Sequence, residues 1–574
     1  MPSAKGSESS PTDGNELSFL SHAEKALTDP GKQANETSGR DSQNEAAEAG
    51  EAAEAAEDED HHYNASNLQL AMLTLGLCLC TLIVSLDVII LATAIPKITA
   101  TFHSLDDVGW YGSSYLLTQT ALQPSFGMIY NYFDTKWTFL CGILVFEVGS
   151  VLCAAANSSN MLIVGRAVAG VGAAALFSGG MNIIAMSVAL KRRAPYIALL
   201  SSMLGISNVA GPPLGGVLTD RLGWRWCFWI NLPCGGVAFG IVLLFLKRRT
   251  GNATPQMGLK ERLAALDPLG GILLLAGITT FLLGIAWGGT MYAWSDAKVW
   301  GCILASGLIM TMFCVTQWKR GDRATIPSRL LLKQRTMLGS SLFSCFLSMG
   351  FYVHVYYLPI YFQAVKGSTP GQSGLDLIPY QISNTAASLG VSILVGILGW
   401  YVPFVWLGAI AFIVGSGLLY TLKVNSSAAT LIGYQIVAGA GLGGSVQIPY
   451  IAAQVVSSKR DMSSANAIMI FFHSIGGTIG LAIGQNIFLS TLKRVLPLDA
   501  PLVNATALIA AGPTNLRSFT PPEQLAGVLE AYNTSIVKAF ISSIATGLVA
   551  FLFSLLMEWK SVKGIDMLTG ERRE

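Results

Sequence analysis

From about residue 68 to residue 557, runs of about 20 apolar residues alternate with short polar breaks. An α-helix needs about 20 apolar residues to cross the roughly 30 Å hydrocarbon core of a bilayer. We count fourteen runs, the tenth being the weakest, with centres near residues 80, 119, 147, 174, 207, 238, 278, 307, 350, 385, 412, 443, 478 and 547. The sequence therefore predicts an all-α polytopic membrane protein with fourteen transmembrane helices.

Charged residues are scarce and unevenly distributed. They make up 12% of the 574 residues, about half the share in soluble domains. Residues 1–61 contain 15 of the 34 acidic residues but only 4 of the 36 basic ones, so the body is basic. We expect residues 1–67 to form a disordered, acidic cytoplasmic tail, because they have too little apolar surface to offset the entropy of ordering.

The composition also excludes several classes of protein. The basic residues are scattered between apolar runs, which argues against a nucleic-acid binder and favours the lipid bilayer as the partner. The nine cysteines lie in or beside apolar runs without a C-x-x-C pair, so we expect buried thiols, not a metal site. We expect no cofactor.

The distribution of Lys and Arg predicts the orientation in the membrane. With a cytoplasmic N-terminus, the inner breaks hold the basic clusters 191–193, 247–249, 319–335, 459–460 and 560–573. The outer breaks hold little beyond Lys97, Arg221, Arg225, Lys298 and Lys366. Both ends of the chain are then cytoplasmic. Asn425, Asn504 and Asn533 stand in outer breaks in glycosylation tripeptides, which are common by chance.

Three charged residues lie well inside the apolar runs: Asp87, Glu147 and Arg166. A charge at this depth costs roughly 2.5–3.5 kcal/mol or more on insertion scales and is functional by default. A carboxylate here could bind and release protons, with Asp87 as the leading candidate and Glu147 as the second. Arg166 could regulate such a carboxylate by pairing with it and releasing it. The alternatives are structural roles: a fixed ion pair of Asp87 and Arg166 that joins two helices, a helix-end dipole as the partner of Asp87, or one hydrogen bond from Glu147 to a neighbouring helix.

The fifth run reads Gly205-Ile-Ser-Asn-Val-Ala-Gly211-Pro212-Pro213-Leu-Gly215-Gly216. Proline removes a backbone donor and bends a helix, while glycine lets a neighbouring backbone come close. We therefore expect a bent and tightly packed helix that is suited to a gate or a seal.

Together these residues resemble the major facilitator superfamily, and within it the fourteen-spanning drug:proton antiporters. The resemblance covers about residues 70–560. The stretch Leu86–Pro96 is similar to the first-helix motif of that family, Gly165–Gly172 to the fourth-helix motif, and Gly205–Gly216 to the fifth-helix antiporter motif. Residues 224–233 and 357–366 are similar to stretches in fungal members that export toxins and secondary metabolites.

One loop departs from the family pattern. The loop between the second and third helices usually reads Gly-x-Leu-x-Asp-Arg-x-Gly-Arg-Lys. In this chain, Asn131 stands where the family has Asp, and Tyr132 stands where it has Arg. We therefore do not carry a gating salt bridge over to this loop.

The resemblance implies two six-helix bundles, residues 68–250 and 336–557, joined by a linker at 251–335 with two extra transmembrane helices. An outer loop is expected at about 493–536 and a cytoplasmic tail at 558–574. Substrate would bind between the bundles near the midplane. Candidate cavity residues are Tyr111, Tyr115, Gln119, Gln123, Tyr352, Tyr356, Tyr357, Gln363, Gln447 and Phe472.

The leading hypothesis is a monomeric, proton-coupled exporter of a moderately apolar organic molecule: a toxin, a secondary metabolite or a drug. We expect it in the plasma membrane, with a vacuolar or vesicle membrane as the alternative. The alternative function is a proton-coupled importer, such as a siderophore-chelate transporter. An enzyme is disfavoured because no D-x-D or H-x-x-x-H cluster occurs at a membrane face, and a sensor because residues 1–67 are too polar to form a structured extension.

Overall fold

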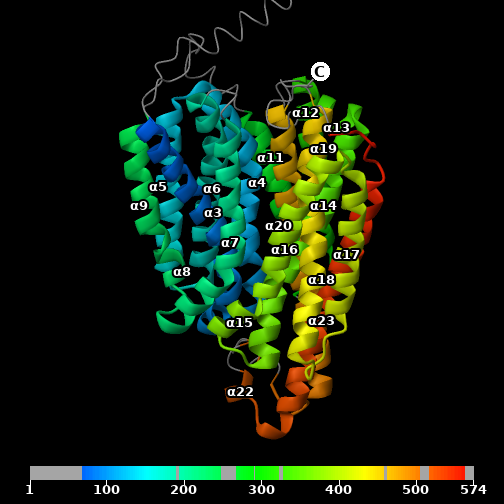
Figure 1. Cartoon of the computed structure of the whole chain (residues 1–574). Helices are drawn as coiled ribbons and strands as arrows, with labels where there is room; N and C mark the ends of the chain where they lie inside the picture. Colours follow the sequence, from blue (N-terminus) through cyan, green and yellow to red (C-terminus); the bar gives the residue numbers. More distant parts are fainter. Residues whose placement is uncertain are drawn as a thin grey trace, which may run out of the picture. The chain divides into compact units, whose positions relative to one another are not determined.

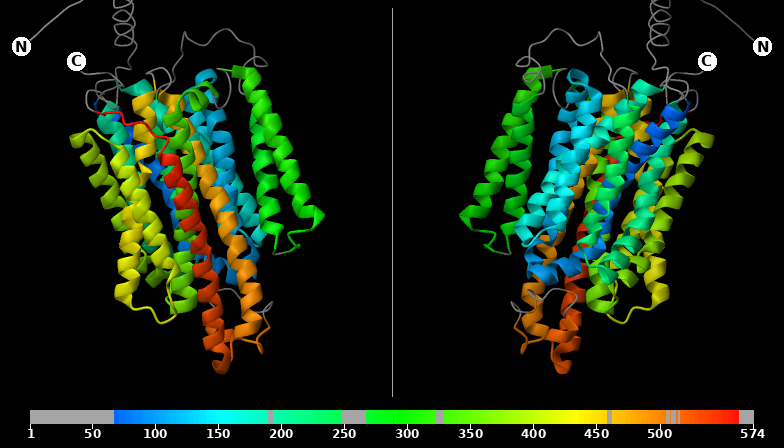
Figure 2. Two further views of the ribbon diagram at one scale, coloured as in Figure 1. Left: turned by 90° about the vertical axis from the view of Figure 1, so that its right-hand side faces the viewer. Right: turned by 90° about the vertical axis from the view of Figure 1, so that its left-hand side faces the viewer.

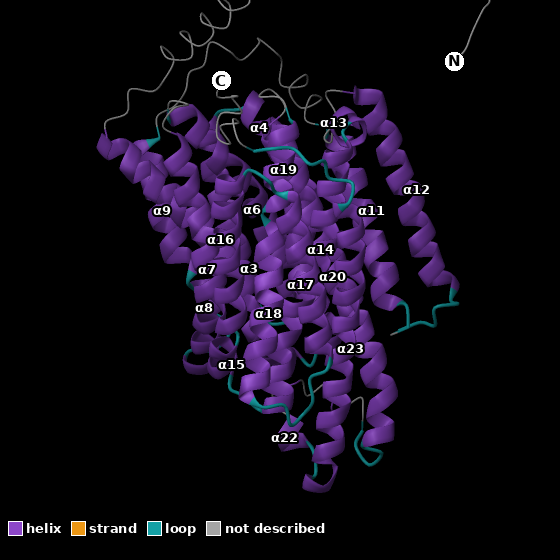
Figure 3. Ribbon diagram, turned by 45° about the vertical axis from the view of Figure 1, so that its right-hand side comes forward, coloured by secondary structure: helices purple, strands orange, loops and turns teal. Residues whose placement is uncertain are grey.

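The computed structural model describes residues 67–188, 193–246, 267–289, 291–321, 328–457, 462–504, 508, 513 and 516–562. All but the last residue of the predicted N-terminal tail lies outside this part of the chain, as do the basic clusters 247–249 and 459–460. Apart from two isolated β-bridges, the regular structure of the described residues is helical (Figure 3). The predicted all-α fold class is confirmed.

The helices before residue 246 pack together as an N-terminal group (Figure 1). The members of this group are α3 (Asn67–Phe102), α4 (Val108–Tyr132), α5 (Thr135–Ala154), α6 (Ser159–Ser187), α7 (Arg193–Arg221), α8 (Trp226–Trp229) and α9 (Asn231–Phe245). The short helix α8 is followed almost directly by α9. We call the end at which α3 begins the inner end, following the predicted orientation, and the opposite end the outer end.

The helices after residue 334 form a C-terminal group. Its first helix, α14 (Arg335–Ile360), continues into the π-helical turn η4 (Tyr361–Lys366). The other members are α15 (Pro370–Asp376), α16 (Ile378–Leu398), α17 (Val402–Tyr420), α18 (Ala428–Val446), α19 (Ile448–Val456), α20 (Met462–Asp499), α22 (Leu516–Phe519) and α23 (Pro522–Ser554). Within the predicted outer loop at about 493–536, α20 continues to Asp499 and α23 begins at Pro522; the bounds of this loop stay a prediction.

Each of the fourteen predicted centres falls in a helix of its own. Twelve membrane-spanning candidates among the described residues are long and apolar enough to cross a bilayer. The helices α4 and α7, with 25 and 29 residues, are long enough but less apolar. The lower hydrophobicity of α4 comes from a set of buried polar side chains, among them Gln119, Thr120 and Gln123. The count of fourteen spans stays a prediction.

The two groups repeat the same helix contacts. Gly149 of α5 lies directly against the backbone of Ala169 in α6, and Gly415 of α17 lies in the same way against Ala438 in α18. A side chain at either glycine would overlap the facing backbone, so both pairs need this close approach. The further matching contacts are Gly172–Phe146 with Gly441–Phe412, and Gly170–Tyr115 with Gly439–Tyr380.

Between the groups the chain forms a hairpin of α11 (Pro268–Trp287) and α12 (Ala297–Arg320), followed by the short α13 (Ser328–Lys333). Figure 2 shows the hairpin at the side of the molecule, in green. Its α11 contacts both α4 and α20, so it covers the junction of the two groups. Asn486 of α20 donates to the backbone oxygen of Ile285 at 2.7 Å. At the inner end, Asp267 caps α11 and accepts from Gln317 at 2.7 Å.

The two groups meet closely in their outer halves. The Asp220 carboxylate accepts from the N–H of Gly371 in α15 at 2.7 Å. The amide of Gln363 donates to the backbone oxygen of Thr93 at 3.0 Å, which joins η4 to α3. Gln485 of α20 donates to the backbone oxygen at residue 105 at 2.8 Å. These contacts close the outer end in this conformation.

Candidate proton-coupling site

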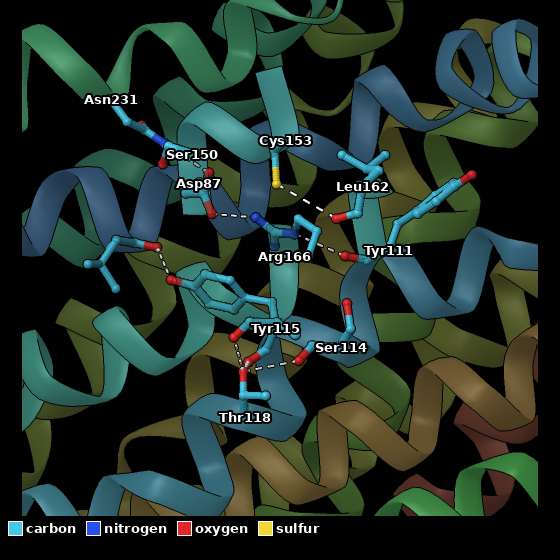
Figure 4. A network of polar contacts seen from close by, with 12 residues as sticks. Asp87, Tyr111, Ser114, Tyr115, Thr118, Ser150, Cys153, Leu162, Arg166 and Asn231 are labelled. Carbon is cyan, nitrogen blue, oxygen red and sulfur yellow. Dashed lines mark hydrogen bonds and ion pairs between the residues drawn. The ribbon is translucent and has the colours of Figure 1, made fainter. Parts of the chain in front are cut away.

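The centre of the N-terminal group contains one buried ion pair (Figure 4). The Asp87 Oδ2 of α3 accepts from the Arg166 Nη1 of α6. Asp87 is 1% exposed and Arg166 is 0% exposed. Because an arginine is always charged, its burial at this depth requires a negative partner. The pairing that the sequence left open for these two residues is confirmed.

Three further helices hold the pair in place. From α9, the Asn231 Nδ2 donates to Asp87 Oδ1 at 2.9 Å and lies 3.2 Å from the Oγ of Ser150 in α5. From α4, the backbone oxygen of Tyr111 accepts from Arg166 Nε at 3.0 Å. The Arg166 guanidinium carbon lies 4.3 Å from the centre of the Tyr115 ring, a cation–π contact. Five helices thus meet at one pair of charges.

The sequence of α6 explains how a large, charged side chain fits here. Gly165, Gly170 and Gly172 each lie against a neighbouring helix, where a Cβ atom would overlap a backbone or side-chain atom. Small residues at these positions bring α4 and α5 close to α6. The guanidinium is therefore enclosed by protein groups and not by lipid.

Several polar atoms at or beside the ion pair have no hydrogen-bond partner among the described residues. They include Arg166 Nη2, the Oδ1 of Asn231 and the hydroxyl of Tyr356 on α14. The Tyr356 hydroxyl is near enough to both charges to interact with them electrostatically. The site is therefore built by the N-terminal group but faces a tyrosine of the C-terminal group.

Glu147 lies outside this ion pair. It stands on α5 one turn to the inner side of Ser150, and its carboxyl lies against Gly235 of α9. Both carboxyl oxygens are buried without a hydrogen-bond partner in the described part of the chain.

The stretch Gly205–Gly216 of α7, predicted to form a seal, packs against α3 and against α15 of the C-terminal group. Gly211 and Gly215 lie against α3, at Ile89 and Ile90. Gly216 lies against the backbone of Pro370 in α15, and Gly374 of α15 lies against the backbone of Pro212. Pro213, the second proline, lies at the same contact. Gly205, nearer the inner end, makes only an ordinary contact with Thr385 of α16.

The predicted cavity residues lie in several different places. Tyr111 and Tyr115 belong to the ion-pair network, and the Tyr111 hydroxyl bonds to Ser104 and Ser159 within the N-terminal group. Tyr357 and Gln363 take part in the outer closure, since Tyr357 donates to Gln485 at 3.0 Å.

The remaining predicted cavity residues do not form one cluster. Gln119, Gln123, Tyr352 and Tyr356 are buried. Phe472 is half-buried and packs near α11, and Gln447 is exposed at the junction of α18 and α19. Whether any of them contacts substrate stays a prediction.

The three predicted glycan acceptors differ in exposure. Asn425 and Asn504 are exposed. Asn533 is 4% exposed inside α23, and its amide donates to the backbone oxygen of Leu422 at 3.2 Å. The folded structure therefore contradicts glycosylation of Asn533, because its amide nitrogen is enclosed between helices.

The loop between α4 and α5, whose sequence differs from the family pattern, has a structural role in this chain. The Asp134 carboxylate caps α5 by accepting from the N–H of Trp137 at 3.1 Å. Lys136 donates to the backbone oxygen of Leu243 at the end of α9, at 2.7 Å. Both charges act within the N-terminal group.

Sequence reasoning missed Asn231 and Ser150. Asn231 stands in the stretch 224–233 that resembles fungal exporters, but its side chain was assigned no role. An amide in a run of apolar residues was the available signal, since a buried amide needs partners. Its distance of 144 residues from Asp87 hid the contact.

Comparison with known proteins agrees with this architecture. The family model described as Major Facilitator Superfamily matches residues 77–481. An MFS-type efflux pump of Arthroderma benhamiae is 41% identical over 501 residues, covering 87% of this chain and 93% of the relative. An aspyridones efflux protein of Neocamarosporium betae is 40% identical over 502 residues, covering 87% and 89%.

Solved structures of low sequence identity share the fold. A bacterial homolog of the human lysosomal transporter Spinster, in an inward-facing and unoccupied conformation, matches with a TM-score of 0.60 and 15% identity, covering 86% of this chain and 98% of the other. A D-xylose–proton symporter matches with a TM-score of 0.56 and 12% identity, covering 86% and 98%. With the family model and the full-length relatives in agreement, this chain belongs to the major facilitator superfamily and is a multi-pass membrane protein.

Proposed function

We propose that this protein is a secondary active exporter that exchanges protons for a moderately apolar organic molecule, such as a toxin or a secondary metabolite. The observation that carries the proposal is similarity at about 40% identity, over nearly the whole chain, to relatives named as efflux pumps. These relatives do not favour the importer. The buried ion pair Asp87–Arg166 supports a proton gradient as the energy source.

In this proposal Asp87 carries the proton. The conformation described here would be the unloaded state, in which Asp87 is ionised and held by Arg166 and Asn231. Protonation of Asp87 removes the negative charge and leaves Arg166 buried without an ionic partner, which is costly. The structure must then rearrange until the guanidinium finds other acceptors or water.

The rearrangement can reach the C-terminal group through Tyr356. Its hydroxyl has no hydrogen-bond partner among the described residues and is close enough to Arg166 to interact with its charge. An arginine released from Asp87 gains a hydroxyl acceptor by moving toward α14. Proton binding would thereby change the contact between the two helix groups, as alternating access by rocking of two halves requires.

The antiporter motif of α7 would keep the outer end closed during substrate loading from the inside. Glycines at 216 and 374 bring α7 and α15 into backbone contact, and Asp220 adds a hydrogen bond across the two groups. Such a seal would stop protons from leaking past the substrate path. We expect the protein to act as a monomer in the plasma membrane.

The test uses intact cells of a host without its own efflux pumps. Ethidium serves as the probe, because its fluorescence falls as it leaves the cell, and mass spectrometry compares small molecules in cells and medium. We expect export that stops when an uncoupler collapses the proton gradient, and that is lost in Asp87→Asn. The control is Asp106→Asn, an exposed outer acid.

Two results would contradict the proposal in different ways. If cells with and without the protein retain the same molecules, the protein is not an exporter of this class. If Asp87→Asn reaches the membrane and exports at the normal rate under a proton gradient, Asp87 has no part in coupling.

A further inference from the structure

Glu147 is a second acid inside the N-terminal group, and its surroundings differ from those of Asp87. Asp87 accepts hydrogen bonds from Arg166 and Asn231. Glu147 is partly buried, yet both of its carboxyl oxygens are covered and have no hydrogen-bond partner among the described residues. Burial of an ionised carboxylate without a donor or a cation costs several kcal/mol. The environment of Glu147 therefore suits the neutral acid.

Arg166, on the neighbouring α6, is already paired with Asp87, and no cation forms an ion pair with Glu147 in the described part of the chain. From α3 the titratable groups that interact with it are the Cys80 thiol and the Asp87 carboxylate. From α9 the group is the Cys234 thiol. The negative charge on Asp87 disfavours a second negative charge on Glu147, and the two thiols carry no positive charge that could offset one.

Space around the carboxyl is made by a glycine. The Glu147 carboxyl lies where a side chain at Gly235 would stand, so any larger residue there would overlap it. Gly235 is four residues after Asn231 on α9, and Glu147 is three residues before Ser150 on α5. Residues with these spacings share one face of a helix. The Glu147–Gly235 contact therefore lies directly beside the Ser150–Asn231 contact.

These two contacts connect Glu147 with the ion pair. The Asn231 Nδ2 faces both Ser150, at 3.2 Å, and Asp87, at 2.9 Å. Glu147 lies about one helical turn, or about 5 Å along the axis, to the inner side of Ser150. A strip of polar groups thus runs from Asp87 through Asn231 and Ser150 toward Glu147, which lies on its inner side.

We propose that Glu147 is a second proton-binding site, which takes the proton that Asp87 releases and holds it on the way to the inner side. The Asp87 O–H bond breaks, an O–H bond forms on the Glu147 carboxylate, and the negative charge moves to Asp87. Asp87 then pairs again with Arg166. The structure corresponds to the state after this transfer, with Asp87 paired and Glu147 neutral.

This proposal rests on the proposed function, but its first test does not need transport. The purified full chain in lipid nanodiscs is treated with dicyclohexylcarbodiimide, which reacts with protonated carboxyls in apolar surroundings, and modified peptides are found by mass spectrometry. At neutral pH we expect Glu147 to be labelled at least about tenfold more than Glu530, which is exposed and not in apolar surroundings. Labelling of Glu147 no higher than that of Glu530 would overturn the proposal.

Infrared spectroscopy of the same sample gives a second readout. The carbonyl stretch of a protonated carboxylic acid should be present in the wild type and in Glu530→Gln, and should be lost in Glu147→Gln. An unchanged spectrum of a folded Glu147→Gln protein would refute a proton on Glu147. Since neither readout involves a substrate, failure of export alone would contradict the proposed function and leave Glu147 as a proton site.

The transport consequence is tested with ethidium in proteoliposomes. Glu147→Gln should still exchange ethidium down its own gradient but should lose accumulation driven by a proton gradient. If Glu147→Gln accumulates ethidium at the wild-type rate under a proton gradient, the acid is not on the proton path.

Discussion

The clearest test of the site is a double-mutant cycle on the pair Asp87–Arg166. Asp87→Asn leaves Arg166 charged and buried with uncharged partners: the Tyr111 backbone oxygen, the Tyr115 ring and the amide oxygen of the new asparagine. Removal of one partner of a buried ion pair costs about 3–5 kcal/mol, and the cation–π contact with Tyr115 already exists in the wild type, so it offsets none of this loss. We expect each single variant to lose about 3–5 kcal/mol of stability.

The double variant Asp87→Asn/Arg166→Gln should be more stable than the sum of the single losses predicts. With both charges removed, no uncompensated charge remains, and residues in direct contact are expected to be coupled. The assay is thermal unfolding in detergent with a thiol-reactive fluorophore. The thiols that report unfolding are the buried cysteines Cys78, Cys80, Cys153, Cys227 and Cys345.

The matched control is the exposed pair Lys493–Asp106 at the outer end, with a distance of 3.3 Å between Nζ and Oδ1. Surface pairs contribute about 0–1 kcal/mol, so the same cycle there should show little coupling. If the two cycles give the same coupling, or if the Asp87 and Arg166 losses simply add, the argument from burial is wrong.

Two further predictions concern the ends of the molecule. Gly216→Leu should separate α7 from α15, because its side chain would overlap the α15 backbone; spin-label distances across this contact should increase, while the exposed neighbour Val217→Leu should leave them unchanged. At the inner end, a hydrogen bond with Lys560 and the nearby Arg335 lower the pKa of Glu558 below 4.5. Because the pKa of Glu558 is lower in the folded state than in the unfolded state, the ionised carboxylate stabilises the fold at pH values above the unfolded-state pKa. This stability is lost as the pH falls through the folded-state pKa. Thermal unfolding of Glu558→Gln should therefore depend less on pH in the acid range, and equal slopes would contradict this pairing.

Much of the helical framework follows from local sequence. A run of about 20 apolar residues suits a transmembrane helix because the bilayer has a fixed thickness and leaves no water for unpaired backbone groups. Every predicted centre accordingly lies in its own helix. The boundaries were less predictable: α20 and α23 extend past the run that defines them, because they continue to pack on each other. That contact is not local in sequence.

The sequence also identified the three charged residues at membrane depth, Asp87, Glu147 and Arg166. A charge there is costly and therefore indicates a functional or structural role. It could not decide which of them meet. Asp87 and Arg166 are 79 residues apart, and Glu147 forms no ion pair among the described residues. The packing of α3, α4, α5, α6 and α9 around small residues determines these contacts. It places Asp87 beside the Arg166 cation and the Asn231 amide, and it places Glu147 against Gly235. Hydrophobic length acts within a single segment, whereas the partner of a buried charge depends on which segments come together.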